Sequence, residues 1–160
     1  MTNMTFSHLD ERGQPNMVDV GEKQVSRRTA VARSIVSLPA EVLEQLANGD
    51  IQTKKGSVFQ TAVIAGIMAA KKTGDLIPLC HSLGLDNCNI HIYLNEQQEV
   101  VIDCTATITA KTGVEMEALV GASIAALTVY DMCKALSHDI VINETKLMEK
   151  TGGKRDFKRT

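Results

Sequence analysis

The segment Ala118-Leu-Val-Gly-Ala-Ser-Ile-Ala-Ala-Leu-Thr-Val-Tyr130 is an uncharged run of mostly small apolar residues with charged residues crowded at both ends. Its alanine, leucine and methionine content, extended on both sides, predicts a helix over residues 114–136. Such a helix is apolar around nearly its whole circumference, so we expect it to be buried on all sides. The run is shorter than the roughly 20 residues that a bilayer requires, so protein rather than lipid should surround it.

Ionisable side chains mark both ends of this predicted helix: Glu115 and Glu117 at its start, Asp131 and Lys134 at its finish. Buried acids and amines have shifted pKa values unless they are paired, which is how sites for proton transfer are made. A purely structural interpretation is also open, because acids in a first turn and a cation in a last turn favour the helix dipole. Asp131 fits that interpretation poorly, since an acid near a C-terminal end opposes the dipole and only Lys134 compensates it.

The helix rises about 1.5 Å per residue, so Glu117 and Asp131 are separated by roughly 21 Å, too far for one small molecule to touch both. Either one cluster is structural, or two copies of the helix run antiparallel and build a composite site between subunits. Small residues would permit the close approach of two such helices; they are Gly121, Ala122, Ala125 and Ala126. The second alternative predicts self-association.

The whole chain has the composition of an ordinary globular domain. Its 160 residues are 44% hydrophobic and 22% charged, enough to bury one core, so we expect a single domain. A net charge of -2 and only 3% aromatic residues exclude the basic stripe or stacking platform of a nucleic-acid binder. We see neither a secretory signal nor a stretch long enough to span a membrane, and we expect no membrane partner and a cytoplasmic location.

Hydrophobic periodicity predicts the remaining elements. The clearest are two strands of alternating apolar residues, 88–94 and 100–109, joined by a hairpin at 95–99. Ser57 is a predicted N-cap for a helix that runs through Lys72. The other predicted elements are a strand over 30–38, a short helix opened by Pro39 and closed by Gly49, a polar loop over 48–56, and a last strand over 140–148.

This order of elements is the split βαβ arrangement of ferredoxin-like folds. We therefore predict an α+β fold with an antiparallel sheet and helices packed on one face. The bare face of such a sheet, together with the apolar helix, predicts an oligomer. The predicted divisions are an N-terminal arm over 1–27, one ferredoxin-like domain over 28–150, and a C-terminal tail over 151–160.

The cysteines do not predict a metal centre. Cys88 and Cys104 fall on alternating apolar positions and are typical of core residues. Cys80 with adjacent His81 would supply half of a site, but no second ligand pair is visible, so we predict no metal. There is no glycine-rich phosphate fingerprint either, so lysine and arginine side chains must hold any phosphate.

Five longer motifs indicate a protein family, which the chemistry of their single residues does not. They are Met17-Val-Asp-Val20, Thr61-Ala-Val-Ile-Ala-Gly-Ile-Met-Ala-Ala-Lys71, Asp75-Leu-Ile-Pro-Leu-Cys-His81, Lys111-Thr-Gly-Val-Glu-Met-Glu-Ala-Leu119 and Tyr130-Asp-Met-Cys-Lys-Ala135. In this order, and over nearly the full length, the chain closely resembles the cyclic pyranopterin monophosphate synthase family, the molybdenum-cofactor biosynthesis protein C.

The resemblance implies a lyase that acts second in molybdenum-cofactor synthesis. Its substrate would be the 3′,8-cyclised dihydro-GTP, and its products would be cyclic pyranopterin monophosphate and diphosphate. It also implies a ferredoxin-like fold and a hexamer built as a trimer of dimers, with active sites between subunits. No cofactor is evident, and the resemblance leaves open whether Mg²⁺ accompanies the triphosphate.

The site residues that the resemblance implies are named by position in this chain. The catalytic positions are Lys55, Asp131 and Lys134. The substrate-contacting segments are Leu79, Cys80 and His81, and Met116 with Glu117. Further polar positions that would line the pocket are Glu115, Asp19, Arg28 and Lys154. The chain departs from the family pattern at Ser82, where proline is usual, and in a glycine-rich tail that is one residue shorter.

Two other classes of function remain as alternatives. One is a non-catalytic ferredoxin-like oligomer that senses a nucleotide or pterin without changing it. The other is a structural assembly subunit whose helix-end charges form salt bridges between copies. The joint presence of Lys55, Asp131 and Lys134 favours the enzyme, because packing alone has no use for a lysine in a loop.

Overall fold

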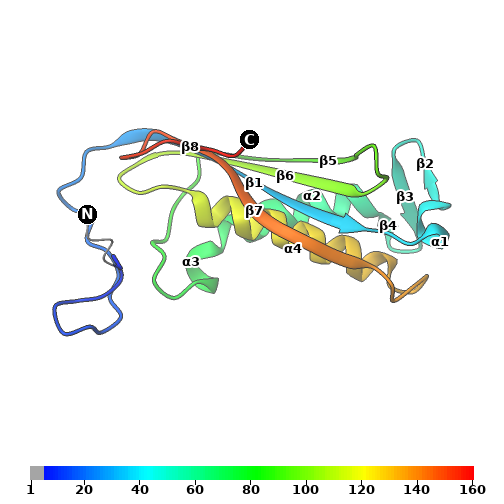
Figure 1. Ribbon diagram of the computed structural model, residues 1–160, viewed down its shortest axis with the longest axis horizontal. Helices are drawn as coiled ribbons and strands as arrows, with labels where there is room; N and C mark the ends of the chain where they lie inside the picture. The colour runs from blue at the N-terminus through cyan, green and yellow to red at the C-terminus, as the bar shows by residue number, and fades with distance from the viewer. Residues whose placement is uncertain (1–5) are drawn as a thin grey trace.

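The computed structural model describes residues 6–160, and its centre is one antiparallel sheet. The strands lie in the order β5-β6-β1-β7-β8. Two long helices, α2 and α4, cover one face of the sheet, and no helix of the described residues covers the other (Figure 1). The predicted α+β, split βαβ arrangement is confirmed. The bounds are β1 Ser26–Ser37, α2 Val58–Lys71, β5 Asn87–Leu94, β6 Val100–Ala110, α4 Glu115–Cys133, β7 Val141–Thr151 and β8 Phe157–Lys158.

The strand β1 shows how sequence alternation builds the sheet. Residues Ala30, Ala32, Ser34 and Val36 are fully or almost fully buried, while the side chains between them are only half-buried. Because successive side chains of a strand point to opposite faces, these four face the helices. The strand pairs with β6 on one side and β7 on the other, which places it at the centre of the fold.

The segment predicted as a polar loop before α2 is instead a small second sheet. A four-residue helix, α1 Ala40–Leu43, precedes it, and its strands are β2 Leu46–Ala47, β3 Asp50–Thr53 and β4 Gly56–Ser57. The predicted short helix therefore ends at Leu43 rather than near Gly49, because β2 begins at Leu46. Strands of two to four residues are too short to show a period, which is why alternation did not reveal them.

The helices α2 and α4 meet through glycines. A Cβ added to Gly66 would lie 2.7 Å from the carbonyl oxygen of Gly121, and one added to Gly121 would lie 2.6 Å from the Sγ of Cys104. The prediction that Gly121 permits close approach to a second copy of α4 is therefore wrong. Its missing side chain lets α4 pack against α2 and the sheet of its own chain, and Ala122, Ala125 and Ala126 are likewise fully buried in this core.

The predicted burial of α4 on all sides is also wrong for a single protomer. One face is buried against α2, β1, β6 and β7. The opposite face carries Leu127, which is 52% exposed, beside an outer face of α2 on which Ile64 and Met68 are 60% and 51% exposed. A core helix needs cover on its whole apolar surface, and within one chain the fold covers only part of it.

By length and composition alone, α4 is the one helix of residues 6–160 that could cross a bilayer. Half of that span is buried inside the protein, where it packs on the sheet. Packing in the core of this domain therefore explains the apolar composition of α4.

Candidate functional site

The ionisable residues of α4 lie in two separate clusters, one at each end of the helix. At its C-terminal end, Asp131 lies between two lysines: Lys134 Nζ is 2.7 Å from Oδ1, and Lys55 Nζ is 3.5 Å from Oδ2. They line a cavity of about 450 Å³. The structure thus brings together the three predicted catalytic residues within one chain, although Lys55 is far from the other two in sequence.

Lys55 reaches this cluster because a short hairpin turn presents it. The turn connects β3 to β4, and Gly56 at its end has a φ of +107°, which favours glycine. Thr53 Oγ1 accepts a hydrogen bond from the Lys55 backbone N–H at 3.1 Å and donates one to the Gly56 carbonyl at 3.1 Å. The backbone of Lys55 is therefore held on both sides.

One carboxylate, Asp50, ties this turn to α2. Its Oδ1 accepts hydrogen bonds from the backbone N–H groups of Phe59 at 2.9 Å and Ile51 at 2.6 Å, and its Oδ2 accepts one from the Ser57 hydroxyl. Ser57 in turn caps α2 by accepting from the N–H of Gln60. Burial would raise the pKa of Asp50, but these hydrogen bonds outweigh it and lower the pKa.

The charges of the C-terminal cluster reinforce one another. The hydrogen bond and charge of Lys134, together with the charge of Lys55, lower the pKa of Asp131. The hydrogen bond that Lys134 donates to Asp131 raises the pKa of Lys134. Both side chains are about half exposed in the protomer, so at neutral pH they form a solvated ion pair. A donor and an acceptor of protons thus stand side by side.

The second cluster surrounds a cavity of about 380 Å³ at the N-terminal end of α4. One wall is the N-terminal arm, one is the segment after α3 Thr73–Leu76, and one is the turn that leads into α4 with its first residues. His81 Nε2 is 2.8 Å from the carbonyl oxygen of Val18 on the arm. The predicted substrate-contacting residues that line this cavity are Leu79, Cys80, His81, Met116, Glu117 and Glu115.

Glu117 is the most buried acid of this cavity, with 4% of its surface exposed. Burial raises its pKa, and the negative charge of Glu115 raises it further. Burial likewise raises the pKa of the Cys80 thiol, and the charge of Glu117 adds to the effect. Glu117 is therefore an acid that takes up a proton more readily than an exposed carboxylate does.

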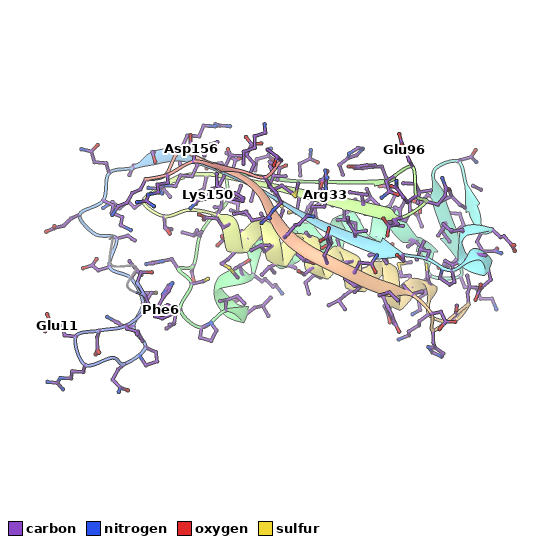
Figure 2. All side chains as sticks on the ribbon, viewed as in Figure 1. Phe6, Glu11, Arg33, Glu96, Lys150 and Asp156 are labelled. Carbon is purple, nitrogen blue, oxygen red and sulfur yellow. The ribbon has the colours of Figure 1, made fainter. Side chains whose placement is uncertain are left out.

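A more basic cavity of about 690 Å³ adjoins this cavity of about 380 Å³, and Gly113 and Glu115 line both. The predicted residues Arg28 and Lys154 lie here. The Nζ of Lys150 is 3.0 Å from Oε1 of Glu115. Figure 2 shows Lys150 toward the same end of the molecule as Asp156 in the C-terminal tail, away from Glu96. Four cationic side chains line this cavity and suit phosphate oxygens; they are Arg28, Lys150, Lys154 and Arg155.

Sequence reasoning missed Lys150 and Arg155 among these cations. The signal available was a concentration of basic residues at the end of the chain, where Lys150, Lys154, Arg155, Lys158 and Arg159 follow closely. Asp19 is the one predicted residue that lines none of the cavities described: it is exposed, and its Oδ1 accepts a hydrogen bond from the N–H of Gly21.

The two clusters do not meet within one protomer. The helix between them has 19 residues, about 28 Å at the usual rise of an α-helix. Between residues 6 and 160 there is also no group of three or more histidine, cysteine or acidic side chains placed to hold a metal ion.

Comparison with known proteins identifies the family of this chain. The model of the MoaC family matches residues 17–153. A protein of Xanthomonas campestris, named cyclic pyranopterin monophosphate synthase, is 54% identical over 156 residues, which are 98% of this chain and 94% of that protein.

Longer relatives contain a similar region. The molybdenum cofactor biosynthesis bifunctional protein of Synechocystis is 52% identical over 159 residues, and the chain spans 46% of its length. Molybdenum cofactor biosynthesis protein 1 of Dictyostelium discoideum is 47% identical over 171 residues, and the chain spans 27% of it. On the match to the family model and the identity over nearly the whole chain, this protein belongs to the MoaC family.

Proposed function

We propose that this protein is a cyclic pyranopterin monophosphate synthase. It converts the 3′,8-cyclised dihydro-GTP to cyclic pyranopterin monophosphate and releases diphosphate, as a step of molybdenum-cofactor synthesis. The observation that carries the proposal is the 54% identity to a protein of that name across nearly the full length of both chains. The ionisable clusters at the two ends of α4 are the chemistry that such a reaction needs.

The C-terminal cluster supplies proton transfer. Opening the five-membered ring of the purine and rearranging it requires groups that both give and take protons. Asp131, bonded to Lys134 and close to Lys55, offers a carboxylate beside two ammonium groups. In this proposal Asp131 orients Lys134, and Lys55 approaches the reacting atoms from the hairpin turn.

The N-terminal cluster binds the substrate. Glu117 and His81 position the purine-derived ring in the smaller cavity, because a carboxyl group and an imidazole can pair with its N–H and carbonyl groups. The cations of the adjoining cavity hold the triphosphate and stabilise the negative charge that develops as diphosphate leaves; they are Arg28, Lys150 and Lys154.

The complete site forms between two copies of the chain. The clusters are too far apart on one α4 to act on one small molecule, so the C-terminal cluster of one protomer must meet the N-terminal cluster of another. The exposed apolar side chains of Ile64, Met68 and Leu127 on α2 and α4 support such an association. We propose a hexamer built as a trimer of dimers.

The proposed location is the cytoplasm. All four cysteines are free thiols, including the half-buried Cys80 and Cys88. Free thiols are typical of a reducing compartment.

The direct test supplies the purified protein with the cyclised nucleotide and measures diphosphate and the oxidised, fluorescent derivative of the pterin product. Loss of a group that transfers protons lowers turnover by about 10²- to 10⁴-fold, so we expect at least a hundredfold loss for Lys55→Ala and Asp131→Asn. Lys72→Ala, at the exposed end of α2, is the matched lysine control. No product from the wild-type protein with intact reactant would overturn the proposal.

A further inference from the structure

The N-terminal arm folds into a small hairpin over residues 8–16, outside the five sequence motifs. The N–H of Asn16 donates to the carbonyl oxygen of His8 at 2.8 Å, and Leu9 forms an antiparallel bridge with Pro15. Asp10 closes the turn: its Oδ1 accepts from the N–H groups of Arg12 and Gln14 at 2.9 and 2.8 Å. The hairpin therefore has a defined backbone although it is short.

The apolar core does not account for the position of this hairpin. Leu9 and Met17 are each about half exposed, and Phe6 is exposed almost completely. The arm is attached to the domain through hydrogen bonds instead, from His81 to the carbonyl of Val18 and from Lys111 Nζ to the carbonyl of Gly21. Ordering a polar segment loses conformational entropy, and so little buried apolar surface offsets only part of that loss. A ligand held between arm and domain would offset more.

The hairpin places His8 on the wall of the smaller cavity, together with the family's substrate-contacting residues. His8 lines it from the arm, while Cys80, His81 and Glu117 line it from the domain. The carbonyl of Val18 can only accept a hydrogen bond, so Nε2 of His81 carries a proton and is committed to the arm. His8 therefore adds to the cavity an imidazole with both ring nitrogens outside any hydrogen bond of the described residues.

We propose that His8 is a further substrate-contacting residue, which hydrogen-bonds the purine-derived ring of the nucleotide and draws the arm over it. A neutral imidazole both donates and accepts, and the ring system offers carbonyl and N–H groups to either. The inference rests on the proposed function for the identity of the ligand. The proposed contact makes the N-terminal arm a part of the substrate-binding site.

The first test is kinetic. With the cyclised nucleotide as the probe, loss of one hydrogen bond to a ligand predicts a rise in KM of about tenfold for His8→Ala, with a smaller change in kcat and partial recovery in His8→Gln. The control is Glu11→Gln, at the far tip of the same hairpin (Figure 2), which we expect to keep the wild-type KM. A wild-type KM for His8→Ala would overturn the inference.

The second test reads the arm without turnover. Trypsin cuts after Arg12, which is exposed at the turn of the hairpin. Bound nucleotide should slow this cut several-fold in the wild-type protein and much less in His8→Ala, measured by mass spectrometry at matched saturation. Equal protection of both proteins would overturn the inference. Absence of turnover in the wild type with protection intact would instead overturn the proposed reaction and leave His8 as a nucleotide contact.

Discussion

Glu117 is the residue in which stability and function conflict most clearly. It is nearly inaccessible to solvent, and burial and the charge of Glu115 raise its pKa. A buried acid of this kind disfavours the folded state whenever it is ionised. Its position at the wall of the cavity fits a binding role better than a packing role.

Glu117→Gln should therefore stabilise the protein at neutral pH. The folded chain holds the Glu117 proton more tightly than the unfolded chain, so stability falls as pH rises above the unfolded pKa of about 4.3 toward the higher folded pKa. We expect a higher Tm for the variant at pH 7 and a difference that shrinks toward zero near pH 4. Calorimetric scans across this range measure it.

The control for this pH series is Glu96→Gln, on the exposed hairpin between β5 and β6 (Figure 2). It should leave Tm unchanged at every pH. A lower Tm for Glu117→Gln than for the wild type at pH 7 would show that the carboxylate is stabilised in the fold and that the assigned direction of its pKa is wrong.

At the scale of elements, the hairpin of β3 and β4 and the start of α2 behave as one unit through Asp50. Asp50→Ala removes the acceptor for three donors, and leaving such donors unpaired costs about 1–3 kcal/mol in the free energy of unfolding. Turnover should also fall, because the turn that carries Lys55 loses its anchor to α2. Urea unfolding and the diphosphate assay measure the two effects.

Asp139→Ala, in the exposed segment before β7, is the matched control and should change neither quantity by much. A destabilised Asp50→Ala variant with wild-type kcat would refute the link between this carboxylate and Lys55. Because the pKa of Asp50 is lowered on folding, its stabilising effect should be complete above about pH 4 and disappear as pH falls through the folded pKa.

The glycine contact between α2 and α4 belongs to the same scale. Gly121→Ala would place a methyl group 2.6 Å from Cys104 Sγ and 3.3 Å from the carbonyl oxygen of Gly66, so we expect a loss of about 1–3 kcal/mol in the free energy of unfolding. Gly84→Ala is the control, since its added methyl group meets no atom within 4 Å. Equal stability of the two variants in urea would mean that the helices can separate freely.

At the scale of the whole molecule, the outer faces of α2 and α4 carry the proposed contact between copies. Leu127→Glu places a charge on that surface and should yield smaller particles by light scattering. Turnover should fall at least tenfold as the composite site is lost. Val25→Glu, an equally exposed apolar position before β1, serves as the control. An unchanged particle mass for Leu127→Glu would exclude this surface as the interface.

The sequence predicted the larger elements and left the smaller ones unseen. Alternation over 88–94 and 100–109 predicted β5 and β6 because strands of that length show a period. The hairpin of β3 and β4 has no such period. Composition predicted a helix buried all round at α4, whereas Leu127 is exposed, because residue types do not tell which neighbours are present in one chain.

The residues of the candidate site also divide into those that the sequence predicted and those that it did not. The family resemblance implied Lys55, Asp131 and Glu117, and their roles remain predictions. Lys150 was not predicted, because only the pairing of β7 with β1 brings it beside Glu115 at the cavity. The sequence alone led us to interpret His8 as incidental, because its hairpin depends on a turn closed by one side chain, Asp10, in a segment without hydrophobic periodicity.

The placement of the two ionisable clusters at opposite ends of α4 has a consequence for mixed assemblies. If each pocket combines the C-terminal cluster of one chain with the N-terminal cluster of the other, Lys55→Ala and Glu117→Gln alter different halves of the pocket. Mixing the two impaired variants should then restore activity. Random re-pairing from denaturant leaves one intact pocket in every mixed pair, about a quarter of the wild-type total. If one polypeptide carries both substitutions and is mixed equally with wild type, the mixed pairs contain no intact pocket. About a quarter of the wild-type total should then come from the wild-type pairs alone.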